Sequence, residues 1–144
     1  MSKRKRVKAK YQPSIKKTVH IAENVDGLRQ LKFKWRVDDK YIDYDHAEWG
    51  WGKVTIQKFF KELLHRLQDY ETMTWDEILR RPSCHDMEAN ELCGEAQRRL
   101  QETHLDIDTL HQLKITQKCR LWGYRDRQDL YLIWHDPHHT VNPV

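Results

Sequence analysis

The C-terminal third of the chain holds two strand-like runs around a short polar segment. Residues 118–125 and 130–136 are rich in branched and aromatic side chains, whereas 126–129 are charged or polar. This pattern is typical of a β-hairpin with a four-residue loop. Asp136-Pro137 ends the second strand, because proline has no amide hydrogen to give to a sheet ladder. The sequence therefore predicts an antiparallel pair of strands before residue 137.

Pairing Arg125 with Leu130 fixes which side chains of this hairpin share a face. Because side chains alternate along a strand, the pairs expected on one face are Tyr124–Tyr131, Trp122–Ile133 and Arg120–His135. The opposite face has Gly123 beside Leu132, and the space above a glycine indicates that this face is the buried one. A slip of one residue would exchange the two faces. In this register Arg120 and His135 meet at an open rim beside the Asp-Pro corner.

The rest of the chain reads as one strand, helices and a further strand. The expected elements are strands over 31–37 and 41–45, helices over 55–70, 75–80 and 89–103, a loop over 83–87, and a strand around Leu113 and Ile115. Thr74 and Glu77 form a capping box at the start of the second helix. Helices followed by consecutive strands predict an α+β fold: an antiparallel sheet with a C-terminal three-stranded meander, packed against about three helices.

Charge is distributed unevenly along the chain. Residues 1–17 contain eight Lys or Arg and no acid, so with a net charge of +4 for the whole chain the remainder carries −4. We therefore expect a basic disordered arm over 1–18 and a single α+β domain over 19–144. Such an arm either neutralises nucleic-acid phosphates or is simply a solvated tail.

No apolar run approaches the length of a membrane span, and no apolar segment follows the basic start of the chain. We therefore expect neither a transmembrane helix nor a secretory signal, and no membrane partner. Cys84, Cys93 and Cys119 are an odd number without paired spacing, which favours reduced thiols and a cytoplasmic location.

Two aromatic or basic segments leave alternatives open. Lys32, Lys34 and Arg36 either line a path for phosphates or keep a sheet edge solvated. Trp49 and Trp51 either stack on bases or fold back over the core, and the usual role of tryptophan as a packing anchor favours the second.

The hairpin face supplies the groups that a metal-free ribonuclease requires, namely a base, an acid and cations for the phosphate. The catalytic candidates are Arg120, His135 and His138. The residues expected to hold nucleic acid are Lys3, Arg4, Lys5, Arg6, Lys114, Trp122, Tyr124, Arg125 and Tyr131. The arm and the basic side chains would hold phosphates, and the aromatic rings would stack on bases.

A metal site is a weaker interpretation of the same corner. His135, Asp136, His138 and His139, together with His85, have the atoms of metal ligands, but no Cys-x-x-Cys or His-Glu-x-x-His motif accompanies them. We therefore expect no metal and no other cofactor.

Two resemblances bear on function. The segments Arg120–Arg125 and Leu130–Val141 read basic-x-Trp-Gly-x-Arg and then an apolar strand ending in Trp-x-Asp-Pro-x-His-x-Val. That pattern resembles one in small bacterial proteins of unassigned function. The predicted order of elements is also similar in topology to the RelE/ParE toxins of toxin-antitoxin modules. The second likeness implies an RNA-cleaving toxin with a protein antitoxin as partner.

Three functions are therefore consistent with the sequence. The first is a small cytoplasmic protein directed at nucleic acid, RNA rather than DNA, that acts as a metal-independent endoribonuclease of toxin type. The second is a noncatalytic nucleic-acid-binding module. The third is a phage or mobile-element protein that binds and inhibits a host protein.

Overall fold

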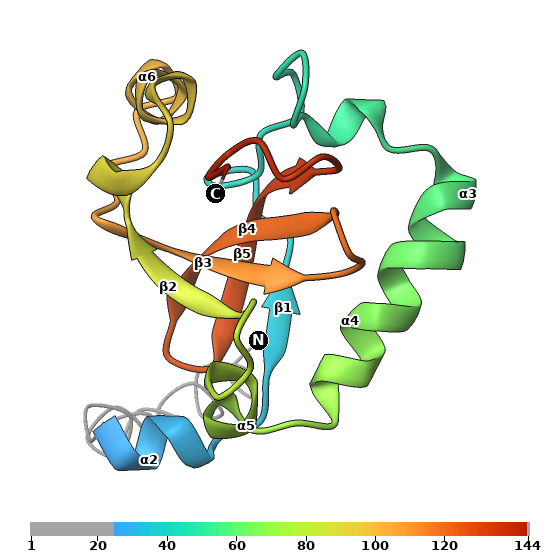
Figure 1. The fold of residues 1–144 in the computed structure, drawn as a ribbon, viewed down its shortest axis with the longest axis vertical. Coiled ribbons are helices and arrows are strands. Elements are labelled where there is room, and N and C mark those ends of the chain that lie inside the picture. Colours follow the sequence, from blue (N-terminus) through green and yellow to red (C-terminus); the bar gives the residue numbers. More distant parts are fainter. Residues whose placement is uncertain (1–24, 144) are drawn as a thin grey trace, which may run out of the picture.

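The computed structural model describes residues 25–143 and shows an α+β arrangement around one five-stranded sheet (Figure 1). The strands are β1 (Lys34–Arg36), β2 (His85–Glu88), β3 (Thr109–Lys114), β4 (Arg120–Asp126) and β5 (Asp129–Asp136), and they lie in the order β1-β5-β4-β3-β2. The C-terminal meander is present, because β3, β4 and β5 pair antiparallel in sequence order. The sheet as a whole is mixed, since β1 pairs parallel with β5.

The predicted wholly antiparallel sheet is therefore wrong at β1. A parallel neighbour requires a long connection, and here residues 37–128 supply it. The alternation of residues 31–37 predicted a strand but held no information about the direction of its partner. The expected partner over 41–45 forms no strand.

The helices after β1 follow the predicted order with local changes, and the helix before β1 was not predicted. They are α2 (Val25–Gln30), α3 (Ile56–Lys58), the π-helix η2 (Phe59–Leu63), α4 (Leu64–Glu71), α5 (Trp75–Leu79) and α6 (Gly94–Glu102), with 3-10 turns η1 (Trp51–Lys53) and η3 (Ala89–Glu91). The predicted helix over 55–70 corresponds to the continuous run of α3, η2 and α4. The capping box of α5 is confirmed. Within residues 25–143, no helix combines the length and apolar character needed to cross a membrane.

Two predicted segments between α5 and β3 differ from the structure. The predicted helix over 89–103 is split, because only η3 and α6 are helical. The predicted loop over 83–87 contains β2, which pairs antiparallel with β3 at the edge of the sheet. The alternation of His85 and Met87 with two acids is too polar to stand out as a strand.

Both faces of the sheet are covered. On one face, α4 and α5 pack on the sheet, and we call the resulting apolar layer the α4 side; its buried members include Leu67, Tyr70, Trp75, Leu121 and Leu132. On the other face α6, residues 41–50 and the C-terminal segment enclose the α6 side, whose buried members include Trp49, Leu100, Trp122, Trp134 and Val141. Figure 1 shows α4 and α6 on opposite sides of the strands. The prediction of a single buried hairpin face is therefore wrong.

A β-bulge in β5 changes the predicted register of the hairpin. Pairing follows the prediction from Arg125↔Leu130 to Gly123↔Leu132, and then shifts to Trp122↔Trp134, Leu121↔His135 and Arg120↔Asp136. Ile133 is the extra residue, so the predicted Trp122–Ile133 and Arg120–His135 pairs are wrong. The bulge adjoins a close approach of the strands, where a Cβ on Gly123 would lie 2.5 Å from the carbonyl oxygen of Tyr131.

Candidate functional site

The bulge separates the two residues that were expected to form the catalytic corner. His135 pairs with Leu121, whereas Arg120 pairs with Asp136. Successive side chains of a strand point to opposite faces, so Arg120 and His135 lie on opposite faces of the sheet. Both are buried, with 6% and 4% of their surface exposed, while His138 is exposed in the turn beyond β5. The predicted set of Arg120, His135 and His138 is not brought together around one open site.

His135 is enclosed on the α4 side, beside Cys119 and Trp51. Its Nε2 lies 3.5 Å from Cys119 Sγ, and its ring lies 5.9 Å from that of Trp51. Burial, and then the charge of Lys58, lower the pKa of His135 to about 4, although Asp136 opposes the shift. Burial likewise raises the pKa of the Cys119 thiol to about 11. At neutral pH this is therefore an uncharged imidazole beside an uncharged thiol, which is a structural contact.

The aromatic residues expected to stack on bases are already packed. Trp122 has no exposed surface, and its Nε1 donates to Asp136. Tyr41 stacks on Tyr124 with ring centres 5.3 Å apart and lies 4.9 Å from the ring of Tyr131. The predicted stacking platform is therefore occupied by the protein itself, because the residues after β1 fold over it.

Arg125 is tied into a network on the α4 side. Its Nη2 donates to Asp86 over 2.8 Å, and its guanidinium lies over the ring of Trp75. Asp86 also contacts the fully buried His111 at 2.9 Å. Burial alone would raise the pKa of Asp86, but His111 and Arg125 together lower it. Arg125 therefore links β4 to β2 and α5, and the structure gives it a carboxylate partner in place of a phosphate.

The structure decides between the alternatives left open for the two tryptophans but does not describe the basic arm. Trp49 is buried and donates to Thr140 over 2.8 Å, and Trp51 packs against the α4 side, so the packing interpretation is confirmed for both. The predicted contacts Lys3, Arg4, Lys5 and Arg6, with the arm over 1–18, lie outside the described residues.

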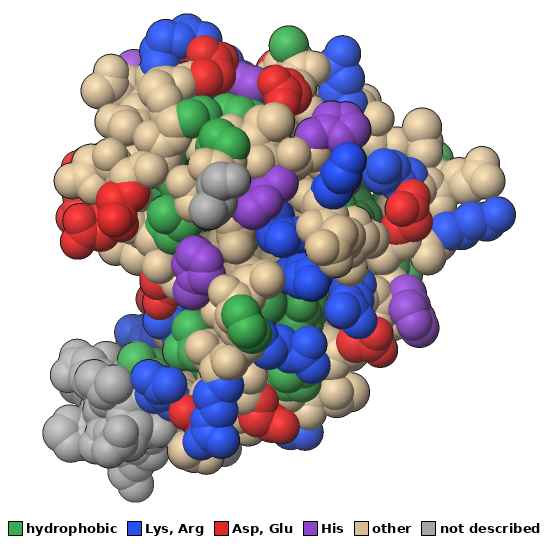
Figure 2. All heavy atoms as spheres, in the orientation of Figure 1, with side chains coloured by type: hydrophobic (Ala, Val, Ile, Leu, Met, Phe, Trp, Pro, Cys, Tyr) green, Lys and Arg blue, Asp and Glu red, His purple; other side chains and the backbone are tan. Residues whose placement is uncertain are grey.

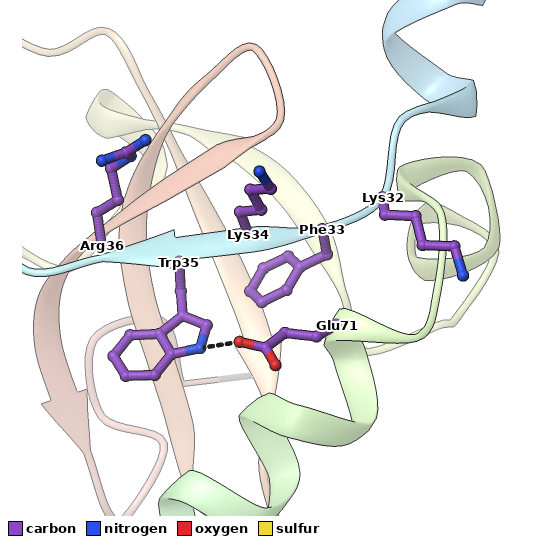
Figure 3. A pocket seen from close by; sticks show the side chains of 6 residues that line it. All are labelled: Lys32, Phe33, Lys34, Trp35, Arg36 and Glu71. Carbon is purple, nitrogen blue, oxygen red and sulfur yellow. Dashed lines mark hydrogen bonds between the residues drawn. The ribbon is translucent and has the colours of Figure 1, made fainter.

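A groove of about 510 Å³ runs along the edge strand β1, lined by Lys32, Phe33, Lys34, Trp35, Arg36 and Glu71 (Figure 3). Phe33 and Trp35 point toward α4, where Trp35 Nε1 donates to Glu71 over 2.8 Å, whereas Lys34 and Arg36 point to the other face of the strand. Arg36 is also paired with Asp129. Lys34 and Arg36 thus do not form one continuous path with the half-buried Trp35 ring. This favours the interpretation in which the cations of β1 keep the sheet edge solvated.

Arg120 is the predicted site residue that keeps an unused binding edge. Its Nη1 donates to the carbonyl oxygens of Thr116, Gln117 and Cys119 at 2.8, 3.2 and 3.1 Å. Its Nε is buried with no hydrogen-bond partner. Among the side chains that the structure describes, none accepts from Nε or Nη2, and because Nε has no accessible surface only Nη2 can meet an acceptor from outside.

Arg99 on α6 shows the same edge satisfied within the molecule. Its Nε and Nη2 donate to the two carboxylate oxygens of Asp43, each over 2.8 Å. Asp43 also accepts from Trp134 Nε1 over 2.8 Å. Burial of Asp43 opposes ionisation, but these hydrogen bonds lower its pKa below the ordinary value. Arg120 lies on the same side of the sheet and has no such partner.

Apart from Asp136, its cross-strand partner on β5, the side chains around Arg120 are positive or neutral. Lys114 is its partner on β3, Gln112 is two residues away on the same face of β3, and His85 pairs with Gln112 from β2. His139 reaches over from the C-terminal segment, with its Nε2 3.3 Å from Gln112 Oε1. We call Arg120, Lys114, Gln112, His85 and His139 the Arg120 corner. Figure 2 shows histidine and Lys or Arg side chains close together near the centre of the face over β3 and the C-terminal segment.

Asp136 lies beneath this corner but is engaged elsewhere. Its oxygens accept from Trp122 Nε1, from the amide and hydroxyl of Thr140 and from the amide of Val141. Burial, and then the charges of Arg120 and His85, lower the pKa of His139, although Asp136 opposes the shift.

This geometry leaves one nitrogen of the guanidinium, Nη2, for an external acceptor, and an anion there would form a charge-assisted hydrogen bond. In the part of the chain that the structure describes, no three His, Cys, Asp or Glu side chains group as metal ligands. Comparisons of the chain with protein-family models, with curated proteins and with solved structures found no match.

Sequence reasoning identified Arg120 and Lys114 but missed how the corner is completed. His85 and His139 were considered only as metal ligands, and Gln112 was not considered at all. The signal that could have found them is β2: once residues 85–88 are paired with β3, His85 falls opposite Gln112 and on the face of Arg120.

Proposed function

We propose that this protein binds nucleic acid, with RNA as the expected type, by holding a phosphate group at the Arg120 corner, and that it does not cleave the chain. The observation that carries the proposal is the Nη2 of a buried arginine, which donates to no described side chain and lies on the same sheet face as Lys114. A phosphate oxygen can accept from that nitrogen and from the Lys114 ammonium.

The charge pattern of the chain supports a local phosphate site. Outside residues 1–17 the chain carries −4, so a polyanion is repelled by much of the surface and attracted where cations gather. The arm, which carries +8, would add affinity that does not depend on base sequence and that weakens with salt. The corner would contribute the part that depends on geometry.

Binding without cleavage is favoured over the endoribonuclease of toxin type. Transphosphorylation requires a base at the 2′-hydroxyl and cations at the same phosphate. His135, one of the predicted bases, lies on the opposite face from Arg120, and burial lowers its pKa to about 4. Removing His135 from the site takes away one of the two histidines predicted to act with Arg120, and the other, His138, is exposed in the turn beyond β5.

Binding of a labelled single-stranded RNA, followed by fluorescence anisotropy over a series of salt concentrations, tests this proposal. We expect Arg120→Gln to weaken binding roughly 10- to 100-fold, the effect of losing hydrogen bonds to a charged group. Arg80→Gln is the matched control, because Arg80 on the end of α5 has a 75% exposed side chain and only a surface ion pair. DNA of the same sequence tests the preference for RNA.

Three results would contradict the proposal. Equal affinity of the Arg120→Gln and Arg80→Gln proteins would remove the corner from binding. Cleavage of the RNA by the purified protein, lost on His135→Ala, would restore the endoribonuclease hypothesis. Binding of a host protein without any RNA affinity would favour the inhibitor hypothesis.

A further inference from the structure

We infer that the open part of the β1 edge binds an extended segment of a partner protein in which acidic and apolar residues alternate, and that this segment adds a strand to the sheet. The inference goes beyond the proposed function, because it concerns a different surface and does not depend on the Arg120 corner. It follows from three properties of the groove along β1, namely its unpaired backbone groups, its exposed apolar side chains and the charge of its other face.

The backbone of β1 is paired fully on one side only. Lys34 N–H donates to the carbonyl oxygen of Gln128 over 3.0 Å on the β5 side, so the N–H and C=O of Trp35 point to the outer edge. Phe33 points the same way, but its N–H is already used by the carbonyl oxygen of Met73 at 3.0 Å. Among the described residues, none bonds to the backbone groups of Trp35. Such an edge is a template for a further strand.

The groove lies along this open stretch and is accessible. It has a volume of about 510 Å³ and is lined by residues 32–36 and by Glu71 at the end of α4 (Figure 3). At about 3.3 Å per residue, the stretch from Phe33 to Val37 is about 13 Å long, which matches a strand of about four residues. Its Lys and Arg side chains are exposed, so a partner can reach the edge without any movement of the fold.

Apolar side chains on the α4 side of this edge continue into solvent. Trp35 is half-buried, and Val37, two residues further along, is 61% exposed. The ring of Trp35 lies 6.3 Å from that of Phe59, and the ring of Phe59 lies 5.4 Å from that of Phe60, which is 60% exposed. A strand beside β1 would place every second side chain against this surface, and apolar side chains there would remove it from water.

The other face of the same edge is positive. Lys32, Lys34 and Arg36 alternate onto it, and among the β5 residues that pair with β1 only Asp129 is acidic. Asp129 pairs with Arg36 over 2.8 Å, so three cations meet one carboxylate and an excess of two positive charges remains. The turn over 38–40, beyond the edge, carries a charge of −1 and does not cancel this excess. Acidic side chains of an added strand would lie opposite these cations.

These two faces select one kind of occupant. A second copy paired antiparallel about Trp35 would set Lys34 opposite Arg36, and like charges directly opposite each other are destabilising. Residues 1–17 contain eight Lys or Arg and no acid, so charge excludes them as well. A nucleic-acid strand lacks the peptide groups that pair with the backbone of Trp35. The cations of β1 thus keep the edge from pairing with a like edge and leave it open to an acidic strand.

The direct test follows amide hydrogen exchange by NMR while a synthetic peptide is added to the full chain. The peptide alternates Glu and Val, has blocked ends and about eight residues, and is therefore long enough to cover the edge. In the free protein we expect the Trp35 amide to exchange faster than the Phe33 amide, which donates to Met73. At a peptide concentration of about ten times the dissociation constant, exchange at Trp35 should slow about tenfold. The Phe33 amide is the internal control and should not change.

Matched peptides and variants define what the edge recognises. A peptide with Glu and Val in two separate blocks, and one with Lys in place of Glu, should each bind about tenfold more weakly or worse. N-methyl groups on the central amides of the Glu-Val peptide keep its side chains but remove its backbone donors, so binding should be lost. Lys34→Gln should weaken the Glu-Val peptide about threefold, as for one exposed ion pair. Lys118→Gln, at an exposed position in the β3–β4 turn, is the control and should not.

Five results would overturn the inference. They are unchanged exchange at Trp35 with every peptide, equal binding of the alternating, block and Lys peptides, and full affinity of the N-methylated peptide. Slower exchange at Trp35 on addition of single-stranded RNA but not of the peptide would assign the groove to nucleic acid. Exchange at Trp35 that slows as the concentration of the protein alone is raised would assign the edge to a second copy. Thermal unfolding of the two variants establishes that both are folded.

Discussion

Arg99 and Arg120 lie on the same side of the sheet and meet opposite conditions. The Nε and Nη2 of Arg99 donate to the two oxygens of Asp43, and Trp134 Nε1 also donates to that carboxylate. The same edge of Arg120 meets no acceptor among the described side chains, although Arg120 is the more buried of the two. A buried charge is normally matched by an internal partner. The comparison thus distinguishes Arg99, whose partner is an internal carboxylate, from Arg120, whose Nη2 has no acceptor among the described side chains.

The difference arises from where the nearest carboxylates are committed. Asp136 pairs with Arg120 across the strands, yet its oxygens are used by Trp122, Thr140 and Val141. These bonds pin the C-terminal segment over the α6 side. The carboxylate next to Arg120 therefore stabilises the turn that carries His139, and Arg120 is left with one unused edge.

Removal of the Arg99 partner should have the largest effect on stability. Asp43→Asn removes the buried counter-charge of Arg99 and leaves only Glu102 on the exposed side, and we expect the free energy of unfolding to fall by about 4 kcal/mol, as for breaking a buried ion pair. Urea denaturation measures this change. Asp45→Asn, two residues away at an exposed position, is the control and should have little effect. A small loss for Asp43→Asn would mean that the satisfied arginine is not the structural one.

The close approach of strands at the bulge gives the next largest effect. A Cβ on Gly123 would lie 2.5 Å from the backbone oxygen of Tyr131, which cannot move aside like a flexible side chain. We expect Gly123→Ala to lower the free energy of unfolding by about 3 kcal/mol. Gly94→Ala is the control, because nothing lies within 4 Å of its added Cβ and Gly94 begins a helix. Equal stability of the two variants would show that the bulge tolerates a wider strand separation.

The hairpin and capped helices were predictable because their signals are local. The two strand runs, the proline after Asp136 and the Thr74–Glu77 box each act within a few residues. The two-residue loop at Arg127-Gln128 was overestimated as four, since Asp126 and Asp129 themselves pair across the strands. The parallel partner of β1 and the edge strand β2 depend on segments far away in sequence, so no local pattern contains them.

The predicted site fails at the register of β5 and at the burial of Arg120. Arg120 pairs with Lys114 across β4 and β3, but it is buried, whereas an open rim was expected. His135 was misplaced because Ile133 is an extra residue that moves every later side chain of β5 to the other face. A bulge depends on strand contacts on both faces, and the alternation of apolar residues alone does not show it.

The burial of His135 predicts how the stability of the protein depends on pH. Its pKa is about 4 in the folded protein and about 6.5 in an unfolded chain, so protonation favours unfolding. Stability should fall as the pH drops below about 6.5, and this contribution should stop falling near pH 4. The ring lies beside Cys119 and Trp51; the charges of Lys58 and His138 act in the same direction as burial, and that of Asp136 opposes them.

We therefore expect the wild-type protein to lose about 2 kcal/mol more than His135→Gln between pH 7 and pH 4.5. Urea denaturation at the two pH values measures the difference. His65→Gln on α4 is the control, because the His65 side chain is 77% exposed, and it should behave like the wild type. If the wild type and His135→Gln lost equal stability, His135 would have to be more accessible to water than the structure shows.

The smallest expected effect is stabilisation of the folded protein by an anion. It tests directly whether Arg120, unlike Arg99, can bind an external acceptor. Inorganic phosphate that binds only the folded protein should raise its stability by about 1 kcal/mol when its concentration is several times the dissociation constant, which corresponds to about 3 °C in melting temperature. Phosphate also stabilises folded proteins in general by its exclusion from their surface. The informative quantity is therefore the difference between the wild type and Arg120→Met, which removes the charge, with Arg80→Met as control. If phosphate raises the melting temperatures of all three proteins equally, the free edge of Arg120 binds no anion, and Arg99 and Arg120 do not differ in the way proposed.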